Sequence, residues 1–141
     1  MNPIPYFDAH CDTIHRCSMA GTPLRDPELR AFYDAAGSLR HSGGHIDLER
    51  AGAFSRYAQF FALYQDPRLL PQGSTMAKQG QLLHQRFLQE MEQNCDVMVH
   101  CRTGRDVDRA AAEGKMAALL SIEGAELLDC RIDRLDMARD W

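Results

Sequence analysis

The sequence predicts an α/β fold built around a parallel sheet. Short apolar segments typical of buried strands alternate along the chain with segments whose apolar residues recur at helical spacing. This alternation is typical of βα units, in which helices cover the faces of a parallel sheet. The chain has 141 residues, which suits one domain. We therefore expect residues 1–141 to form a single unit.

The predicted strands rest on apolar runs. Residues 56–65 are aromatic and apolar through their middle, as expected of a strand that is covered on both faces. Residues 115–123 form a second strong run, and 6–13 and 96–101 are shorter ones. Residues 16–45 are rich in proline and glycine, so we expect mainly irregular structure there.

Helices are predicted between these strands. Leu83, Phe87 and Met91 recur every four residues, which indicates one apolar helix face. Thr103 and Asp106 have the spacing of a capping box, and Gly114 is placed to end the helix that follows. The predicted helices cover residues 27–36, 74–94, 103–113 and 131–140.

Composition excludes several classes of protein. The net charge is −4, and 26% of residues are charged. No basic face for nucleic acid or anionic lipid is therefore expected. We find no run of 18 apolar residues, and the first residues lack the features of a secretory signal. Five cysteines without a C-x-x-C pair argue against a disulfide framework or a zinc ribbon. We expect a cytoplasmic protein with no membrane partner.

The first candidate for chemistry is the segment Asp8-Ala9-His10-Cys11-Asp12. On a strand, alternate side chains share a face, so His10 and Asp12 should point the same way, and Cys11 the other way. An imidazole and a carboxylate so placed can bind one divalent cation such as Zn²⁺. The alternative is a polar strand end whose side chains pair with their neighbours.

The second candidate is Glu123, which closes an apolar strand before Gly124. A buried carboxylate needs a partner, and a cation would be one. The alternative is an exposed glutamate that opens a loop. The other histidines are interpreted as structural or solvated: His15, His41, His45, His84 and His100. No phosphate loop, G-x-S-x-G elbow or H-E-x-x-H motif occurs.

Four segments, in order, resemble the renal (membrane) dipeptidase family, in the form its bacterial members take. Residues 7–13 (FDAHCDT) resemble its opening strand with D-G/A-H-x-D, and residues 58–64 (AQFFALY) resemble its second strand. Residues 44–52 and 114–124 (GKMAALLSIEG) resemble two further family segments. Arg56 departs from the pattern, because many members have glycine there.

The resemblance implies the N-terminal strands of a TIM-like (β/α)₈ barrel with two zinc ions at the carboxyl ends of its strands. By position, His10 and Asp12 match ligands of one zinc, and Glu123 matches the carboxylate that bridges both. In the family, a metal-bound hydroxide attacks the peptide carbonyl of a dipeptide, often one with a D-residue at its C-terminal side.

The resemblance also implies that this chain carries only part of the site. The family's remaining zinc histidines, and its substrate-binding histidine, arginine and catalytic aspartate, come from strands beyond residue 141. A full barrel of this type needs about 250 residues. We therefore expect His10, Asp12 and Glu123 to converge at one end of a partial sheet. Alone, the chain should be inactive and should need a complementary C-terminal chain or oligomerise.

Other interpretations stay open at this stage. The chain could be a piece of an enzyme, a natural short product without activity, or a non-catalytic interaction module. Another barrel metallohydrolase, such as a TatD-like phosphoesterase, would open with D-x-H-x-H. Asp12 in place of the second histidine, and the segment around Glu123, argue against that class.

Overall fold

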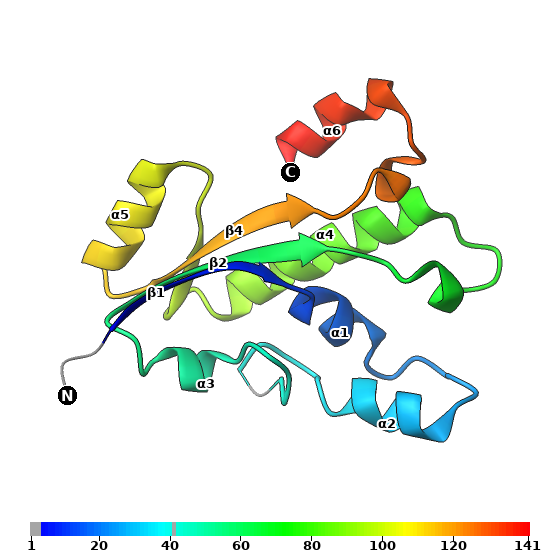
Figure 1. Ribbon diagram of the computed structural model, residues 1–141, viewed down its shortest axis with the longest axis horizontal. Coiled ribbons are helices and arrows are strands. Elements are labelled where there is room, and N and C mark those ends of the chain that lie inside the picture. The colour runs from blue at the N-terminus through cyan, green and yellow to red at the C-terminus, as the bar shows by residue number, and fades with distance from the viewer. Residues whose placement is uncertain (1–3, 41) are drawn as a thin grey trace.

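A computed structural model describes residues 4–40 and 42–141. Its centre is a four-stranded sheet in the order β1-β2-β4-β3, and all its pairs are parallel. The strands are β1 (Pro5–Cys11), β2 (Arg56–Leu63), β3 (Met98–His100) and β4 (Met116–Ile122). The arrowheads of β2 and β4 lie at the same end of the sheet (Figure 1). The predicted α/β class and the parallel sheet are confirmed.

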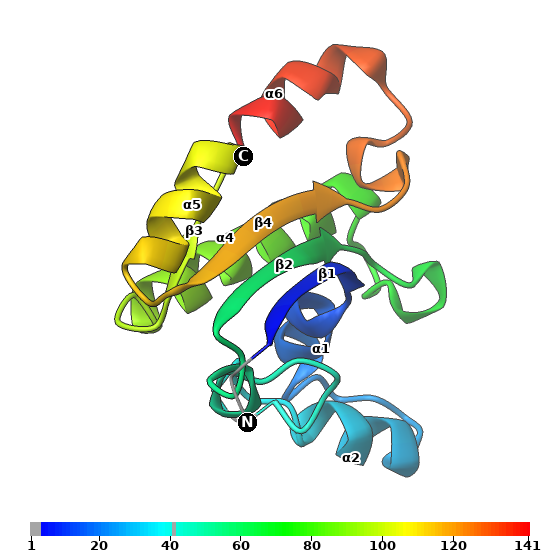
Figure 2. The ribbon, with the colours of Figure 1, turned by 60° about the vertical axis from the view of Figure 1, so that its left-hand side comes forward.

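Helices cover the two faces of the sheet unequally. One face packs on α1 (Thr13–Met19) and on the long α4 (Met76–Gln93), with Phe61 of β2 and Phe87 of α4 at the centre of the main core. The opposite face meets α5 (Gly104–Ala112) through a small cluster around Ala117. Figure 2 shows α4 and α5 on either side of the strands. This opposite face is the less completely covered one.

The remaining elements are short and mostly lie in the connections. They are α2 (Pro27–Asp34), α3 (Leu48–Ala51), α6 (Leu135–Asp140) and the 3₁₀ turns at Pro67–Leu69, Glu126–Leu128 and Ile132–Arg134. No helix in the described residues is long and apolar enough to cross a membrane. All five cysteines are free thiols.

Local sequence signals account for the helix ends. The side chain of Thr103 accepts the N–H of Asp106, and the Asp106 carboxylate accepts the N–H of Thr103, so the predicted capping box is present. Gly114 follows α5 with a φ of +69°, a left-handed conformation that favours glycine. Thr75 caps α4 by accepting the N–H of Lys78.

Two features of the fold differ from the sequence prediction. Helix α1 occupies part of a region expected to be irregular, because β1 ends at Cys11 and the chain turns directly into a helix whose Ile14 and Cys17 are buried in the core. The predicted helix over 131–140 is split into a 3₁₀ turn and α6. The predicted strand 6–13 is correspondingly two residues too long at its carboxyl end.

A buried carboxylate ties the irregular segment before α3 to α4. Glu90 is 1% exposed. One of its oxygens accepts from the backbone N–H of Leu39 and from Asn94, and the other from Arg86 at 2.7 Å. Arg86 also donates to the carbonyl of Gly37. These bonds hold the connection against the helix and satisfy the buried charge.

Candidate metal centre

His10 and Asp12 lie on either side of the point where β1 ends. The register of β1 against β2 shifts between Asp8 and Cys11, so His10 sits in an irregular stretch of the strand. Cys11 is 3% exposed and packs in the core, so it points away from His10, as the strand periodicity predicts. Asp8 accepts the backbone N–H of His10 and thereby supports the local turn.

Asp12 occupies the N-cap of α1, yet its side chain accepts no hydrogen bond from that helix. An N-cap aspartate normally accepts from the first free amides of its helix. Asp26 and Asp47, at the N-caps of α2 and α3, each accept two such bonds. The Asp12 carboxylate instead lies 3.3 Å from Nε2 of His10. Its oxygens are therefore available to a ligand.

Glu123 follows β4 immediately, on the far side of β2 from His10. Its backbone N–H donates to the carbonyl of Leu63, which fixes it beside the end of β2. Its carboxylate lies 3.3 Å from the same Nε2 of His10. The two side chains thus meet across the end of the intervening strand. The convergence predicted from the sequence is present in the structure.

The three side chains form a compact set of donors for a cation. One donor atom from each of His10, Asp12 and Glu123 lies within 4.8 Å of the other two. Zinc ligands at bond lengths of about 2.0–2.2 Å in a tetrahedral site lie roughly 3.3 Å apart. All three side chains are about half exposed, at 51%, 51% and 48%. The donor set and its spacing fit a divalent metal ion.

The charge of the cluster also favours a cation. Two carboxylates approach one imidazole, and a protonated imidazole would offset only one of the two negative charges. A divalent ion would neutralise both carboxylates and bind the imidazole in its neutral form.

A cavity of about 220 Å³ opens directly beside Asp12. Two of its walls come from residues interpreted from the sequence as structural or solvated, His15 and His45. The ring of His15 packs edge-on against Tyr33 and Tyr64 at 5.7 and 5.8 Å. Burial lowers the pKa of His15, so its ring is neutral at pH 7. The positions of two lining residues in the sequence could have indicated this cavity. His15 follows Asp12 by three residues, and Tyr64 directly follows β2.

The other histidines lie away from the centre or outside the described residues. His100 ends β3 and packs edge-on against Phe87, and His84 of α4 stacks on Trp141. His41 falls outside the described residues. His84 and His100 were interpreted from the sequence as structural or solvated residues, and both make ring contacts in the structure.

Comparison with known proteins places this geometry in a family. Residues 1–140 match the sequence model of the membrane dipeptidases, peptidase family M19. This chain belongs to the M19 family. One relative is an uncharacterized protein of Acinetobacter calcoaceticus from the PQQ-III 3' region, which is 29% identical over 149 residues. The match covers 95% of this chain and 45% of that protein.

Solved M19 structures resemble the chain over almost its whole length. The metallopeptidase dipeptidase AC, of family M19, matches with a TM-score of 0.69 and 28% sequence identity. The match covers 99% of this chain and 40% of the dipeptidase AC chain. A Rhodobacter sphaeroides metallopeptidase, solved with a phosphinate mimic of the dipeptide L-Ala-D-Ala, matches with a TM-score of 0.70 and 24% identity. The match covers 99% of this chain and 43% of the Rhodobacter chain.

These comparisons define how much of the family's fold is present. The chain belongs to a family of dipeptidases and carries part of a TIM-like barrel. It spans less than half the length of each of these three relatives.

Proposed function

We propose that this chain provides the N-terminal portion of the active site of a zinc-dependent dipeptidase. The observation that carries the proposal is the convergence of His10, Asp12 and Glu123 within 4.8 Å at the carboxyl ends of β1 and β4. Family membership gives the reaction class, hydrolysis of a peptide bond by a metallopeptidase. In barrel enzymes, this end of the strands carries the chemistry.

In this proposal, His10, Asp12 and Glu123 would be the residues of this chain that hold zinc. Bound zinc would supply an activated water and polarise the peptide carbonyl. The chain's own contribution is to position the donors. The N–H of Glu123 is anchored on Leu63, and the turn after β1 leaves the Asp12 carboxylate free of its helix.

The proposed substrates are dipeptides. The cavity beside Asp12 has a volume of about 220 Å³, and the aromatic rings of Phe32, Tyr33 and Tyr64 form part of its wall. Such a concave, largely apolar wall beside a reactive centre is typical of a substrate subsite. The dipeptide mimic bound to the Rhodobacter relative agrees with this substrate class.

The site of the isolated chain is proposed to be incomplete. A catalytic zinc ion usually has three protein ligands, and here one of the three candidates would be shared with a second ion. The carboxylates of Asp12 and Glu123 both lie against the imidazole of His10. We therefore propose that turnover requires a second polypeptide segment, which supplies the other ligands and the groups that bind the substrate.

The test is reconstitution of activity. The purified chain with zinc is mixed with the C-terminal portion of dipeptidase AC that begins where its match to this chain ends, and hydrolysis of L-Ala-D-Ala is followed. We expect turnover only from the mixture. His10→Ala, Asp12→Ala and Glu123→Ala should each abolish it, whereas Glu113→Ala, at an exposed glutamate before β4, should not. Turnover by the chain alone that His10→Ala removes would contradict the proposal of incompleteness.

A further inference from the structure

Strand β1 carries one extra residue where it passes β2. The two strands pair in step up to Asp8 opposite Gln59, and the next pair is Cys11 with Phe61. Between these pairs β1 has two residues and β2 has one. An extra residue of this kind is a β-bulge, which interrupts the ladder and changes the direction of the side chains that follow.

The bulge decides which face of the sheet His10 occupies. In unbroken register, His10 would stand opposite Phe61, which is fully buried in the main core. Because a shift of one residue moves a side chain to the other face, the imidazole would then enter this core. Cys11 takes that place instead and is 3% exposed, whereas the side chain of His10 is 51% exposed. The bulge therefore keeps His10 out of the core and available to Asp12 and Glu123.

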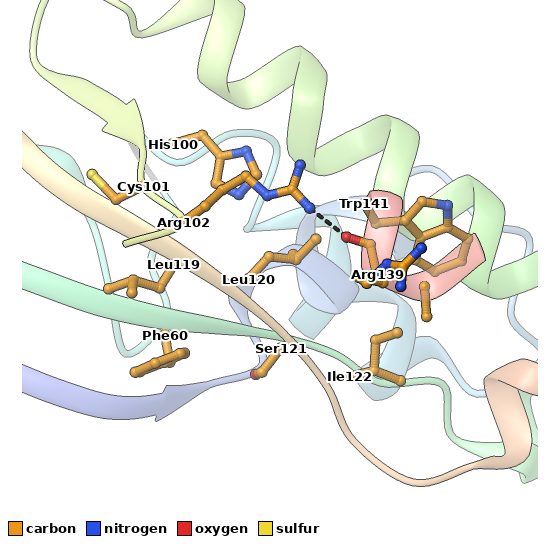
Figure 3. Close-up of a pocket in the computed structure, with 11 residues that line it drawn as sticks. Phe60, His100, Cys101, Arg102, Leu119, Leu120, Ser121, Ile122, Arg139 and Trp141 are labelled. Carbon is orange, nitrogen blue, oxygen red and sulfur yellow. Dashed lines mark hydrogen bonds between the residues drawn. The ribbon is translucent and has the colours of Figure 1, made fainter. Parts of the chain in front are cut away.

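Phe60, the residue of β2 that faces the bulge, projects its side chain from the other face of the sheet. Its ring meets the ring of Phe7 edge-on, at 5.9 Å between centroids. Figure 3 shows Phe60 near Leu119, its partner on β4. The backbone of Phe60 borders the bulge, but its side chain is engaged elsewhere, so another group must hold the two strands together there.

The side chain of Gln59 lies at the bulge and is fully buried. Its carboxamide nitrogen donates to the carbonyl of Phe60 at 2.9 Å and, in a longer bond, to the carbonyl of Asp8 at 3.5 Å. A carbonyl oxygen has two lone pairs, so each can accept this bond beside a ladder bond. The two carbonyls belong to different strands. The carboxamide therefore joins β1 to β2 where the regular register stops.

Tyr57 holds the carboxamide in this orientation. Its hydroxyl donates to the side-chain oxygen of Gln59 at 2.7 Å, from a position two residues earlier on the same face of β2. Both backbone groups at the bulge are acceptors, so the carboxamide must present its nitrogen to them. Burial raises the pKa of the Tyr57 hydroxyl, which therefore keeps its proton and remains a donor.

We propose that Gln59 is a positioning residue of the metal centre. Its carboxamide joins the two strands at the bulge, and the bulge directs His10 away from the core, toward Asp12 and Glu123. The carboxylate of Asp8 supports the same bulge from within β1, because it accepts the N–H of His10 at 3.1 Å. The inference rests on the proposed zinc site, but it concerns the geometry of β1 without metal, which is measured without turnover.

The experiment replaces Gln59 by methionine, which is similar in size and makes no hydrogen bond to the two carbonyls. The NMR signals of the His10 imidazole are recorded without metal, assigned with His10→Ala, and the zinc dissociation constant is measured by calorimetry. Gln59→Met should shift the His10 signals and weaken zinc binding about ten- to hundred-fold, the range typical of groups that orient metal ligands. Tyr57→Phe should act in the same direction and less strongly. It should add nothing to Gln59→Met, because Tyr57 acts through Gln59.

Gln65→Met is the matched control. Gln65 is 2% exposed and, like Gln59, donates to the carbonyl of the next residue at 2.9 Å. It lies beyond the end of β2 and faces no bulge. Its replacement should lower the free energy of unfolding in urea, as the replacement of Gln59 should, but it should leave the His10 signals and the zinc affinity unchanged.

Two results would overturn the inference. One is a folded Gln59→Met variant in which either the His10 signals or the zinc affinity is unchanged, with Tyr57→Phe judged in the same way should Gln59→Met not fold. The other is an equal effect of Gln65→Met, because both glutamines would then act only through stability. A wild-type chain that binds no zinc would contradict the proposed function, and the His10 signals would decide the inference alone. Weaker zinc binding by Gln59→Met, with no turnover from the reconstituted mixture, would support the positioning role and contradict the proposed function.

Discussion

Nε2 of His10 lies 3.3 Å from the carboxylate of Glu123, although these residues stand near opposite ends of the chain. His10 lies on β1 and Glu123 directly follows β4, and these two strands do not pair. Only the parallel arrangement of β1, β2 and β4 brings them to one end of the sheet. The contact therefore depends on the whole fold, and any ion bound there should stabilise the whole fold.

Zinc is expected to raise the melting temperature of the isolated chain. A ligand that binds only the folded state at one hundred times its dissociation constant adds about 2.7 kcal/mol of stability. Thermal unfolding followed by circular dichroism across a zinc titration measures this shift. His10→Ala and Glu123→Gln should remove it, and Glu113→Gln should leave it intact. An equal shift in all variants would mean that zinc binds elsewhere, for example at the exposed thiols of Cys95 and Cys130.

The stacking of the Trp141 indole on His84 is expected to weaken in acid. Burial, and then the neighbouring His100, lower the pKa of His84 below its usual value of 6.5. Because the pKa of His84 is lower while the indole is stacked on it, His84 binds a proton more readily once the indole has moved away. The stacked arrangement is therefore favoured above pH 6.5 and is lost as the pH falls below that value. Trp141 fluorescence between about pH 8 and pH 5 measures the transition. His84→Gln should flatten it and His45→Gln should not.

Removing the buried carboxylate of Glu90 is expected to destabilise the protein strongly. Glu90→Ala leaves the N–H of Leu39 without its acceptor and removes the carboxylate partner of Arg86, which keeps its bond to the carbonyl of Gly37. Breaking a buried ion pair in this way costs about 3–5 kcal/mol. Urea unfolding measures the loss, with Glu92→Ala on the exposed side of the same helix as control. Nearly equal stability of the two variants would show that Glu90 is dispensable.

The isolated chain is expected to self-associate through its exposed sheet. Phe7 of β1 is 60% exposed on an edge strand, a combination that favours pairing between molecules. Phe7→Lys should lower the average mass measured by light scattering after gel filtration. Ile132→Lys is the control, because Ile132 is 83% exposed but lies off the sheet. A monomeric wild-type chain with a sharp thermal transition would refute the expectation.

Periodicity was sufficient to predict most of the fold. The apolar stripe of Leu83, Phe87 and Met91 predicts α4, and the run before Glu123 predicts β4. The order of the strands could not be predicted in the same way, because β4 lies between β2 and the earlier strand β3. Pairing between distant segments is decided by packing in three dimensions, which a single sequence does not display.

The candidate centre was predictable in part, for a physical reason. His10 and Glu123 stand at the ends of apolar runs, where parallel strands place their side chains at a common edge. The sequence did not predict that the Asp12 side chain makes no capping hydrogen bond to α1, because its sequence context is that of an ordinary N-cap. The cavity formed with His15 and Tyr64 was also missed, because its walls come from separate connections.

The parallel sheet has a kinetic consequence. None of its strand pairs is a hairpin, so each pairing must close a long stretch of chain before any ladder bond forms. Topologies of this kind have a high contact order and fold slowly. Glu123 reaches His10 only after β4 has joined β2, so the three donors cannot meet before these strands have paired. A zinc ion present from the start can therefore slow unfolding of the finished domain, but it has no assembled site through which to speed folding.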